Sequence, residues 1–355
     1  MSNRIQILDC TLRDGGFGLE DARIDNKSVP VFSKDDINNI SLSLSNSKID
    51  IIEIGSIEIS INDKRNMAIY QNIESISNEI PVRNNSNQMY AALYRGPDTP
   101  VSDIPNWNKS YCEALRVILR YSELEKSLDF CRDLAKKNYR VFIQPMVTMR
   151  YSNNELQMLI DAANDISAYA LYFVDSYGYM HEQDIKRFFS LYDKGLDASI
   201  KIGFHAHNNM NLAFSNALAF IKQESDREII IDSCCLGMGQ GAGNLQTEII
   251  VDHINKHYGA SYNYDAVLAA CEIIENYWGT SLWGYSLTRL LPAINKTAYK
   301  FSLALRNKYK LSFGEIHNIL KNIPENYRDR YTPDSTKELL ILFGYSSLIQ
   351  ENEIK

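Results

Sequence analysis

The sequence lacks cysteine motifs. Its six cysteines, at positions 10, 112, 131, 234, 235 and 271, are scattered and include no Cys-x-x-Cys pair. This spacing argues against a structural zinc site or a dithiol redox site. The pattern favours small buried apolar residues in a protein from a reducing compartment.

Long apolar runs and basic clusters are lacking as well. No window reaches about 18 consecutive apolar residues, the length that a membrane span needs, and the opening residues lack the apolar core of a signal peptide. The net charge is −7 and no basic run is present, which argues against binding to a phosphate backbone. We therefore expect a cytoplasmic protein with neither a membrane nor a nucleic acid as partner.

What the sequence does contain is a regular alternation of strand and helix patterns. Over roughly the first 255 residues, short β-rich runs alternate with helical periodicity, which is typical of parallel β/α construction. The candidate strands recur at the spacing of barrel units, and they are residues 4–10, 49–54, 89–93, 115–119, 140–147, 168–174, 199–204 and 228–233. Eight such strands predict an α/β fold, the (β/α)8 or TIM barrel.

Helical patterns alternate with the candidate strands as far as residue 260 and then follow one another without strands between them. Ser33 and Asp36 resemble a capping box ahead of a helix, and apolar periodicity predicts further helices over 122–137, 153–166 and 182–192. After about residue 260 the alternation stops, and helix-like segments follow over 264–277, 288–304, 312–323 and 335–343. We expect a catalytic barrel over residues 1–259 and a helical C-terminal domain over residues 260–355.

Polar residues stand at the C-terminal ends of the candidate strands, where the active sites of such barrels lie. The first strand ends in Arg13-Asp14-Gly15-Gly16, which places a fixed positive charge beside a carboxylate on a tight turn. A local ion pair that caps the strand is the alternative. The seventh strand ends in His205-Ala206-His207, and because side chains alternate along a strand, both imidazoles point the same way. Such a pair is a half-site for a divalent metal.

The eighth candidate strand leads into a glycine-rich segment, residues 237–244. By itself this segment is consistent with a phosphate-binding loop or a flexible turn. In a closed barrel, however, strands 7, 8 and 1 are neighbours, so Asp14, His205, His207 and Asn244 can converge on one ion. Imidazole, carboxylate and amide ligands suit Mn²⁺ or Mg²⁺, with Zn²⁺ or Co²⁺ as alternatives.

At these residues the sequence resembles the metallolyases that share the HMG-CoA lyase-type barrel. That family includes 4-hydroxy-2-oxovalerate aldolase, isopropylmalate synthase and homocitrate synthase. The matching motifs occur in the family's order; they are Thr11-Leu12-Arg13-Asp14-Gly15, Glu53, Asp175-Ser176, His205-Ala206-His207-Asn208 and Gly241-Ala242-Gly243-Asn244 with Thr247-Glu248.

The resemblance implies a role for each matching residue. Asp14, His205 and His207 would hold the metal, with Asn244 as a further ligand. Arg13 would stabilise the oxygen of an enolate as negative charge develops. The metal would act as a Lewis acid on the carbonyl and carboxylate of a 2-oxo acid. A homodimer is the assembly that the family implies.

Within the family, two features of this chain resemble the 2-oxo acid aldolases most. The short Gly239-Gln240-Gly241 connection lacks the cysteine-bearing insert of the CoA lyases, and Trp283-Gly284-Tyr285-Ser286 resembles a region from which a tyrosine reaches the active site. Tyr285 is therefore a candidate catalytic acid/base, with aromatic packing as the alternative.

One position departs from those aldolases. Their general-base histidine follows the metal aspartate by three residues, whereas this chain has Phe17, which carries no proton. Either Tyr285, Glu53, Tyr177 or a metal-bound water transfers the proton, or the substrate differs.

Three functions from different classes remain. The first is a divalent-metal-dependent aldolase that acts on pyruvate or another 2-oxo acid and an aldehyde through an enolate. The second is a Claisen-type acyltransferase that condenses acetyl-CoA with a 2-oxo acid, although the C-terminal segment is short for a regulatory domain. The third is a catalytically silent metal-binding barrel, which Phe17 favours. Release of free CoA would identify the second function, and metal binding without enolisation the third.

Overall fold

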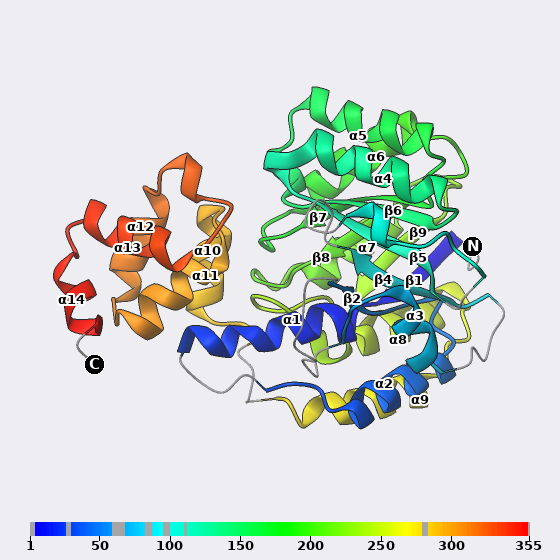
Figure 1. The fold of residues 1–355 in the computed structure, drawn as a ribbon, viewed down its shortest axis with the longest axis horizontal. Helices are drawn as coiled ribbons and strands as arrows, with labels where there is room; N and C mark the ends of the chain where they lie inside the picture. Colours follow the sequence, from blue (N-terminus) through cyan, green and yellow to red (C-terminus); the bar gives the residue numbers. More distant parts are fainter. Residues whose placement is uncertain are drawn as a thin grey trace.

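Eight strands with nearly continuous apolar sequences close into a parallel barrel (Figure 1). The structure is a computed structural model, and it describes residues 4–25, 30–58, 68–81, 87–94, 100–109, 112–278 and 283–353. The barrel strands are β1 (Ile5–Asp9), β2 (Ile51–Ile57), β4 (Met89–Tyr94), β5 (Cys112–Leu119), β6 (Arg140–Pro145), β7 (Ala170–Asp175), β8 (Lys201–Ala206) and β9 (Ile229–Ser233). They follow one another in this order, and β1 pairs with both β9 and β2, which closes the sheet.

All eight predicted strands are confirmed, with ends that shift by a few residues. A two-residue strand, β3 (Ile69–Tyr70), pairs in addition with the end of β2 and was not predicted. The predicted capping box is confirmed: the Ser33 side chain accepts a hydrogen bond from the Asp36 amide, and the Asp36 carboxylate accepts one from the Ser33 amide. It begins the first long helix between barrel strands.

Helices cover the outside of the barrel and continue beyond it (Figure 1). The helices of the chain as far as residue 275 are α1 (Gly16–Leu19), α2 (Lys34–Asn46), α3 (Ile73–Glu79), α4 (Leu124–Lys136), α5 (Asn153–Asp165), α6 (Glu182–Gly195), α7 (Ala213–Ile221), α8 (Thr247–Tyr258) and α9 (Tyr264–Glu275). The later helices are α10 (Leu287–Asn295), α11 (Tyr299–Leu303), α12 (Phe313–Lys321), α13 (Pro333–Leu342) and α14 (Ser347–Glu353). Within the described ranges, none of these helices is both long and apolar enough to cross a membrane.

Apolar residues form two cores. The barrel core includes side chains of α9, such as Val267 and Ile274, and α9 packs against α2. A second core joins α10–α13, with Leu291, Phe301 and Leu339 among its members. Figure 1 shows these later helices as a lobe beside the barrel. We therefore propose that the C-terminal unit begins between α9 and α10 rather than at residue 260.

Inside the barrel, apolar and charged side chains share the space. Alternation along β9 points Ile230 and Asp232 inward and leaves Ile229 and Ile231 for the layer of helices. The ring of Tyr172 occupies the space where a side chain at position 203 would lie, so that a Cβ on Gly203 would meet this ring at 2.2 Å. Arg116 and Asp232 are almost fully buried in this interior, so that a charged layer lies directly below the mouth of the barrel.

Candidate metal centre and active site

Three of the predicted metal ligands meet at the C-terminal mouth of the barrel. Asp14 lies in a π-helical turn (Thr11–Gly15) just after β1, His205 lies on β8, and His207 follows that strand. One ligand atom from each residue lies within 4.8 Å of the other two. The two histidine Nε2 atoms are 3.3 Å apart, so both rings direct the same nitrogen toward one point, as ligands of a shared cation do.

Asn244 joins this group through the glycine-rich loop. Its Nδ2 donates to Asp14 Oδ2 at 2.5 Å, and its backbone bridges to His207. A side chain at position 239 cannot be accommodated, because a Cβ on Gly239 would lie 2.1 Å from Asn244 Nδ2. The loop is therefore a close-packed wall of the site, and its glycines are required by the approach of the backbone to the ligand cluster.

The donor set fits a divalent cation. Asn244 Oδ1 is buried and has no hydrogen-bond partner among the described residues, although a buried acceptor of this kind is costly unless something binds it. A cation at the meeting point of Asp14, His205 and His207 would satisfy such an oxygen. Two imidazoles with carboxylate and amide oxygens suit Mn²⁺ or Mg²⁺.

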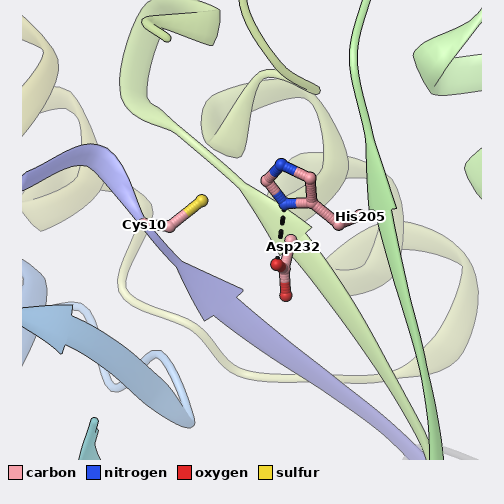
Figure 2. A group of neighbouring side chains, drawn as sticks. All are labelled: Cys10, His205 and Asp232. Carbon is pink, nitrogen blue, oxygen red and sulfur yellow. Dashed lines mark hydrogen bonds and ion pairs between the residues drawn. The ribbon is translucent and has the colours of Figure 1, made fainter. Parts of the chain in front are cut away.

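A hydrogen bond to Asp232 orients His205. Its Nδ1 lies 2.8 Å from Asp232 Oδ2 (Figure 2), which leaves Nε2 for a cation. His207 is oriented in the same way by the backbone of the glycine-rich loop, because its Nδ1 lies 3.1 Å from the carbonyl oxygen of Gln240. Both imidazoles therefore have a fixed orientation before any ligand binds.

A second grouping of potential ligands uses the other side of the same histidine. Cys10, His205 and Asp232 also bring one ligand atom each within 4.8 Å, and Figure 2 shows them on three neighbouring strand ends. However, Asp232 Oδ2 already accepts hydrogen bonds from His205 and Arg116, and Cys10 is fully buried. The Asp14 group is the one that opens to the mouth, where substrate can reach it.

Arg13 lies beside Asp14, one of the candidate metal ligands, and Glu53 lies beside Arg13. Arg13 Nη1 is 2.5 Å from Asp14 Oδ1, and its Nε is 2.8 Å from Glu53 Oε2. Arg116 Nη1 lies 2.5 Å from the same Glu53 oxygen and also contacts Asp232. A continuous chain of buried charges therefore runs from Asp14 through Arg13, Glu53, Arg116 and Asp232 to His205.

Sequence reasoning missed two members of this chain, Arg116 and Asp232. Arg116 stands among the apolar residues 114–119 of β5, and Asp232 follows three isoleucines on β9. Because a buried charge is retained only when it is paired, such residues could have been read as a buried ion pair. Arg116 lies inside β5 and Asp232 one residue before the end of β9, whereas the motifs recognised in the sequence follow the strands.

Neighbouring charges and burial set the pKa values of the ligands. Burial would raise the pKa of Asp14, but the charge of Arg13, followed by those of the two histidines, holds it well below its usual range. Burial would lower the pKa of His205, yet hydrogen bonds with Asp232 and Cys10 raise it to about 10. Burial is the main influence on His207 and lowers its pKa to about 4. Asp14 and His207 are thus held in their metal-binding forms at neutral pH.

A pocket of about 200 Å³ opens next to Arg13. It is lined by Arg13, Phe17, Ile118, Arg120, Met146 and Gln240. No histidine, tyrosine or carboxylate is among these lining residues. Phe17 thus lies in the pocket, at the position where the resemblance led us to look for a base.

The two tyrosines considered for proton transfer are not among the residues that line this pocket. The side chain of Tyr285 is 56% exposed, although the adjoining Gly284 amide donates to the Ala242 carbonyl of the glycine-rich loop. The hydroxyl of Tyr177 donates to Asp329 of the C-terminal helices at 3.1 Å. Their assignment as acid/base groups stays a prediction that this arrangement does not favour.

The chain resembles known proteins over much of its length. A model of the HMGL-like family matches residues 4–274. The 4-hydroxy-2-oxovalerate aldolase of Geobacillus genomosp. 3 is 27% identical over 252 residues, which cover 70% of this chain and 69% of that protein. The oxaloacetate decarboxylase of Mycobacterium tuberculosis is 26% identical over 246 residues, which cover 69% of this chain and 68% of that protein.

The chain is also similar to a third relative over a short segment and to a solved structure over most of its length. The 4-hydroxy-2-oxovalerate aldolase of Thermomicrobium roseum is 43% identical over 86 residues, so the match spans just 24% of this chain and 23% of that protein. Among solved structures, the N-terminal domain of a Bacteroides vulgatus protein assigned as an aldolase has a TM-score of 0.70 at 22% identity, and covers 84% of this chain and 95% of its own. At that identity the likeness shows the fold alone.

Proposed function

The chain belongs to the HMGL-like family, and on that premise we propose that it is a divalent-metal-dependent aldolase acting on pyruvate or another 2-oxo acid and an aldehyde. The observation that carries this proposal is the convergence of Asp14, His205 and His207 beside Arg13 at the mouth of the barrel. The names of the relatives, aldolases and an oxaloacetate decarboxylase, support chemistry that makes or breaks a carbon–carbon bond next to a carbonyl.

In this proposal, one group of residues holds the metal ion and Arg13 stabilises the enolate. Asp14, His205, His207 and Asn244 would hold Mn²⁺ or Mg²⁺, which supplies Lewis-acid polarisation of the substrate carbonyl. Arg13 carries a positive charge fixed by Asp14 and Glu53. A fixed charge beside the carbonyl oxygen favours the enolate over the ketone, because it requires no reorganisation as negative charge develops.

Glu53 acts on the reaction through Arg13. Its side chain is fully buried, and one of its oxygens accepts hydrogen bonds from both Arg13 and Arg116. Two guanidinium groups therefore hold this carboxylate in place next to Arg13. We therefore assign Glu53 the positioning of Arg13 and not the transfer of a proton.

Phe17 favours a second candidate reaction, the decarboxylation of a 2-oxo acid with a carboxylate on C3. In such a substrate the bond from C3 to the carboxylate carbon breaks, CO2 leaves, and the electron pair forms the enolate directly. Water then supplies a proton to C3, so that no side chain has to remove one first. An apolar residue at position 17 suits this reaction, and the similarity to an oxaloacetate decarboxylase is consistent with it.

Product analysis tests these proposals. The protein is incubated with Mn²⁺, pyruvate and an aldehyde such as glycolaldehyde, or with oxaloacetate, and the products are followed by mass spectrometry. A 4-hydroxy-2-oxo acid that disappears when EDTA is added supports the aldolase. Pyruvate and CO2 from oxaloacetate, above the rate with Mn²⁺ alone, support the decarboxylase. Free CoA from acetyl-CoA and a 2-oxo acid would instead select the Claisen-type acyltransferase, and tight metal binding without any turnover would select the silent barrel.

The assembly expected from the family is tested separately. We propose a homodimer, and light scattering coupled to size-exclusion chromatography gives the mass directly. A mass near twice the 40.6 kDa of the chain supports it, and a mass near that of one chain contradicts it.

A further inference from the structure

The pocket beside Arg13 reaches across the mouth of the barrel. Arg13 and Phe17 belong to the helical segment that follows β1, whereas Arg120 and Met146 directly follow β5 and β6. In the barrel order β1-β2-β4-β5-β6, these strands lie three and four places away from β1. Arg120 and Met146 are neighbours there, because the Met146 amide donates to the Leu119 carbonyl at 3.0 Å. One cavity therefore joins the metal side of the mouth to a second arginine on the other side.

The pocket is lined by two arginines and by several apolar side chains. Arg13 is paired with Asp14 and Glu53 at 2.5 and 2.8 Å. Phe17, Ile118 and Met146 give the pocket apolar walls, and Gln240 adds a polar one. Arg120 forms a long ion pair of 3.4 Å with Glu123 at the rim, where both side chains are about one third exposed.

The volume of the pocket limits what it accepts. At about 30 Å³ for each water-sized group, a cavity of about 200 Å³ holds six or seven such groups. The lining includes none of the described metal ligands, so the 2-oxo acid at the metal lies beside this cavity and a second substrate occupies it. A short aldehyde of three or four carbons with one terminal anionic group has the required size and polarity.

We propose that Arg120 binds a carboxylate or phosphate at the far end of the aldehyde substrate, so that the enzyme prefers anionic aldehydes over neutral ones. This proposal rests on the proposed aldolase function. The guanidinium group suits the task, because its planar fork forms two parallel hydrogen bonds with either kind of anion. The apolar walls would position the carbon chain, with its aldehyde carbon next to Arg13 and the metal ligands.

Two matched pairs of aldehydes test the proposal with pyruvate and Mn²⁺. Succinic semialdehyde is compared with butanal, and phosphonoacetaldehyde, whose phosphonate stands in for a phosphate, with propanal, as ratios of kcat/KM. We expect at least a tenfold higher kcat/KM for the anionic aldehyde than for its neutral partner in one of the two pairs. The pair that shows this preference identifies the anion, carboxylate or phosphate, that the site binds. Arg120→Met should reduce that ratio roughly 10- to 100-fold, which is the range for hydrogen bonds to a charged group.

A surface variant controls for the loss of one positive charge. Arg132 lies on the outer face of α4, where it pairs with the exposed Asp129, and Arg132→Met should leave both ratios unchanged. Equal kcat/KM values within both pairs for the unmodified protein, or a preference that survives Arg120→Met, would overturn the proposal.

A binding measurement separates this proposal from the aldolase function. If the protein shows no turnover with any aldehyde, the aldolase proposal fails, and calorimetry with succinate and with inorganic phosphate then decides the role of Arg120. Binding of either anion that weakens at least tenfold in Arg120→Met supports an anion site at this residue. Absence of binding, or equal affinity of the variant and the unmodified protein, overturns it.

Discussion

His205 Nδ1 lies 2.8 Å from Oδ2 of Asp232, so an aspartate inside the barrel orients a candidate metal-binding histidine at its mouth. The same oxygen accepts a hydrogen bond from Arg116, which in turn contacts Glu53, the partner of Arg13. The proposed metal site and the proposed enolate-stabilising charge are therefore held by one buried network, and disturbing its centre should affect both.

Asp232→Asn should weaken metal binding without removing any ligand. The amide can still occupy the site, but it loses the negative charge that holds His205 and Arg116. Outer-shell changes of this type typically cost 10- to 100-fold in metal affinity, and we expect a loss in this range for Mn²⁺ by calorimetry. Asp129→Asn, on the exposed face of α4, serves as the control. A Kd for Mn²⁺ in Asp232→Asn that stays within twofold of the unmodified protein would contradict the account.

Arg116→Met should destabilise the fold strongly. Arg116 is fully buried between Glu53 and Asp232, so its removal leaves two carboxylates without their shared cation. Breaking one partner out of a buried ion pair costs roughly 3–5 kcal/mol, which denaturant unfolding measures as a lower free energy of unfolding. Arg132→Met, at the surface, should change that free energy by less than about 0.5 kcal/mol. Similar values for the two variants would show that the buried network contributes little to stability.

Asp175 should make stability depend on pH. Burial is the main influence and raises the pKa of Asp175 to about 7, despite hydrogen bonds from the Tyr179 and Met180 amides. Because the folded-state pKa lies above the unfolded value of about 3.9, the carboxyl contributes its full stability below pH 4, and this contribution is lost as the pH rises to 7.

Asp175→Asn isolates this effect. The free energy of unfolding of the unmodified protein, relative to that of the variant, should fall by roughly 2–4 kcal/mol between pH 4 and pH 7.5. Urea unfolding at several pH values measures this difference. Parallel pH profiles for the two proteins would mean that Asp175 is ionised in the folded state.

Gly239→Ala should act on the metal site through contact alone. A Cβ at this position would lie 2.1 Å from Asn244 Nδ2 and 2.8 Å from Asp14 Oδ2, so the new methyl group must push both side chains away. We expect a clear loss of Mn²⁺ affinity, on the order of tenfold or more. Gly259→Ala is the matched glycine variant, since its added Cβ meets no atom within 4 Å. Because Gly259 has a positive φ, the alanine variant introduces backbone strain but no steric contact, so the Mn²⁺ affinity of this variant should equal that of the unmodified protein.

Most of the fold could be predicted from the sequence because the barrel strands are nearly continuous apolar runs between helical segments. The ligand cluster could be predicted because its members stand at strand ends, where parallel strands bring them together. Strand β3 has just two residues, too few to give a pattern. The roles of Arg116 and Asp232 depend on which side chains face each other inside the closed barrel, and that register is not visible in a single sequence.

The helices after the barrel show a different limit of sequence reasoning. The pattern located α9 well, but the single helix predicted over 288–304 is divided at Lys296 into α10 and α11. It also could not tell that α9 packs against α2 and that Leu291 belongs to a second core. The apolar periodicity of an amphipathic helix indicates that one of its faces is buried, but it does not indicate which element packs against that face. In the same way the sequence near Tyr285 suggests a catalytic tyrosine, and its half-exposed side chain leaves that role a prediction.

The central claim, that the site at the barrel mouth forms an enolate, is tested most directly by proton exchange at the methyl group of pyruvate. The reaction is followed by NMR in D₂O with Mn²⁺-loaded or Mg²⁺-loaded protein, with His205→Ala as the site variant and His257→Ala, an exposed histidine of α8, as its control. We predict metal-dependent loss of the methyl proton signal that is abolished in His205→Ala and retained in His257→Ala. Absence of exchange with either metal, or exchange that persists in His205→Ala, would contradict the account.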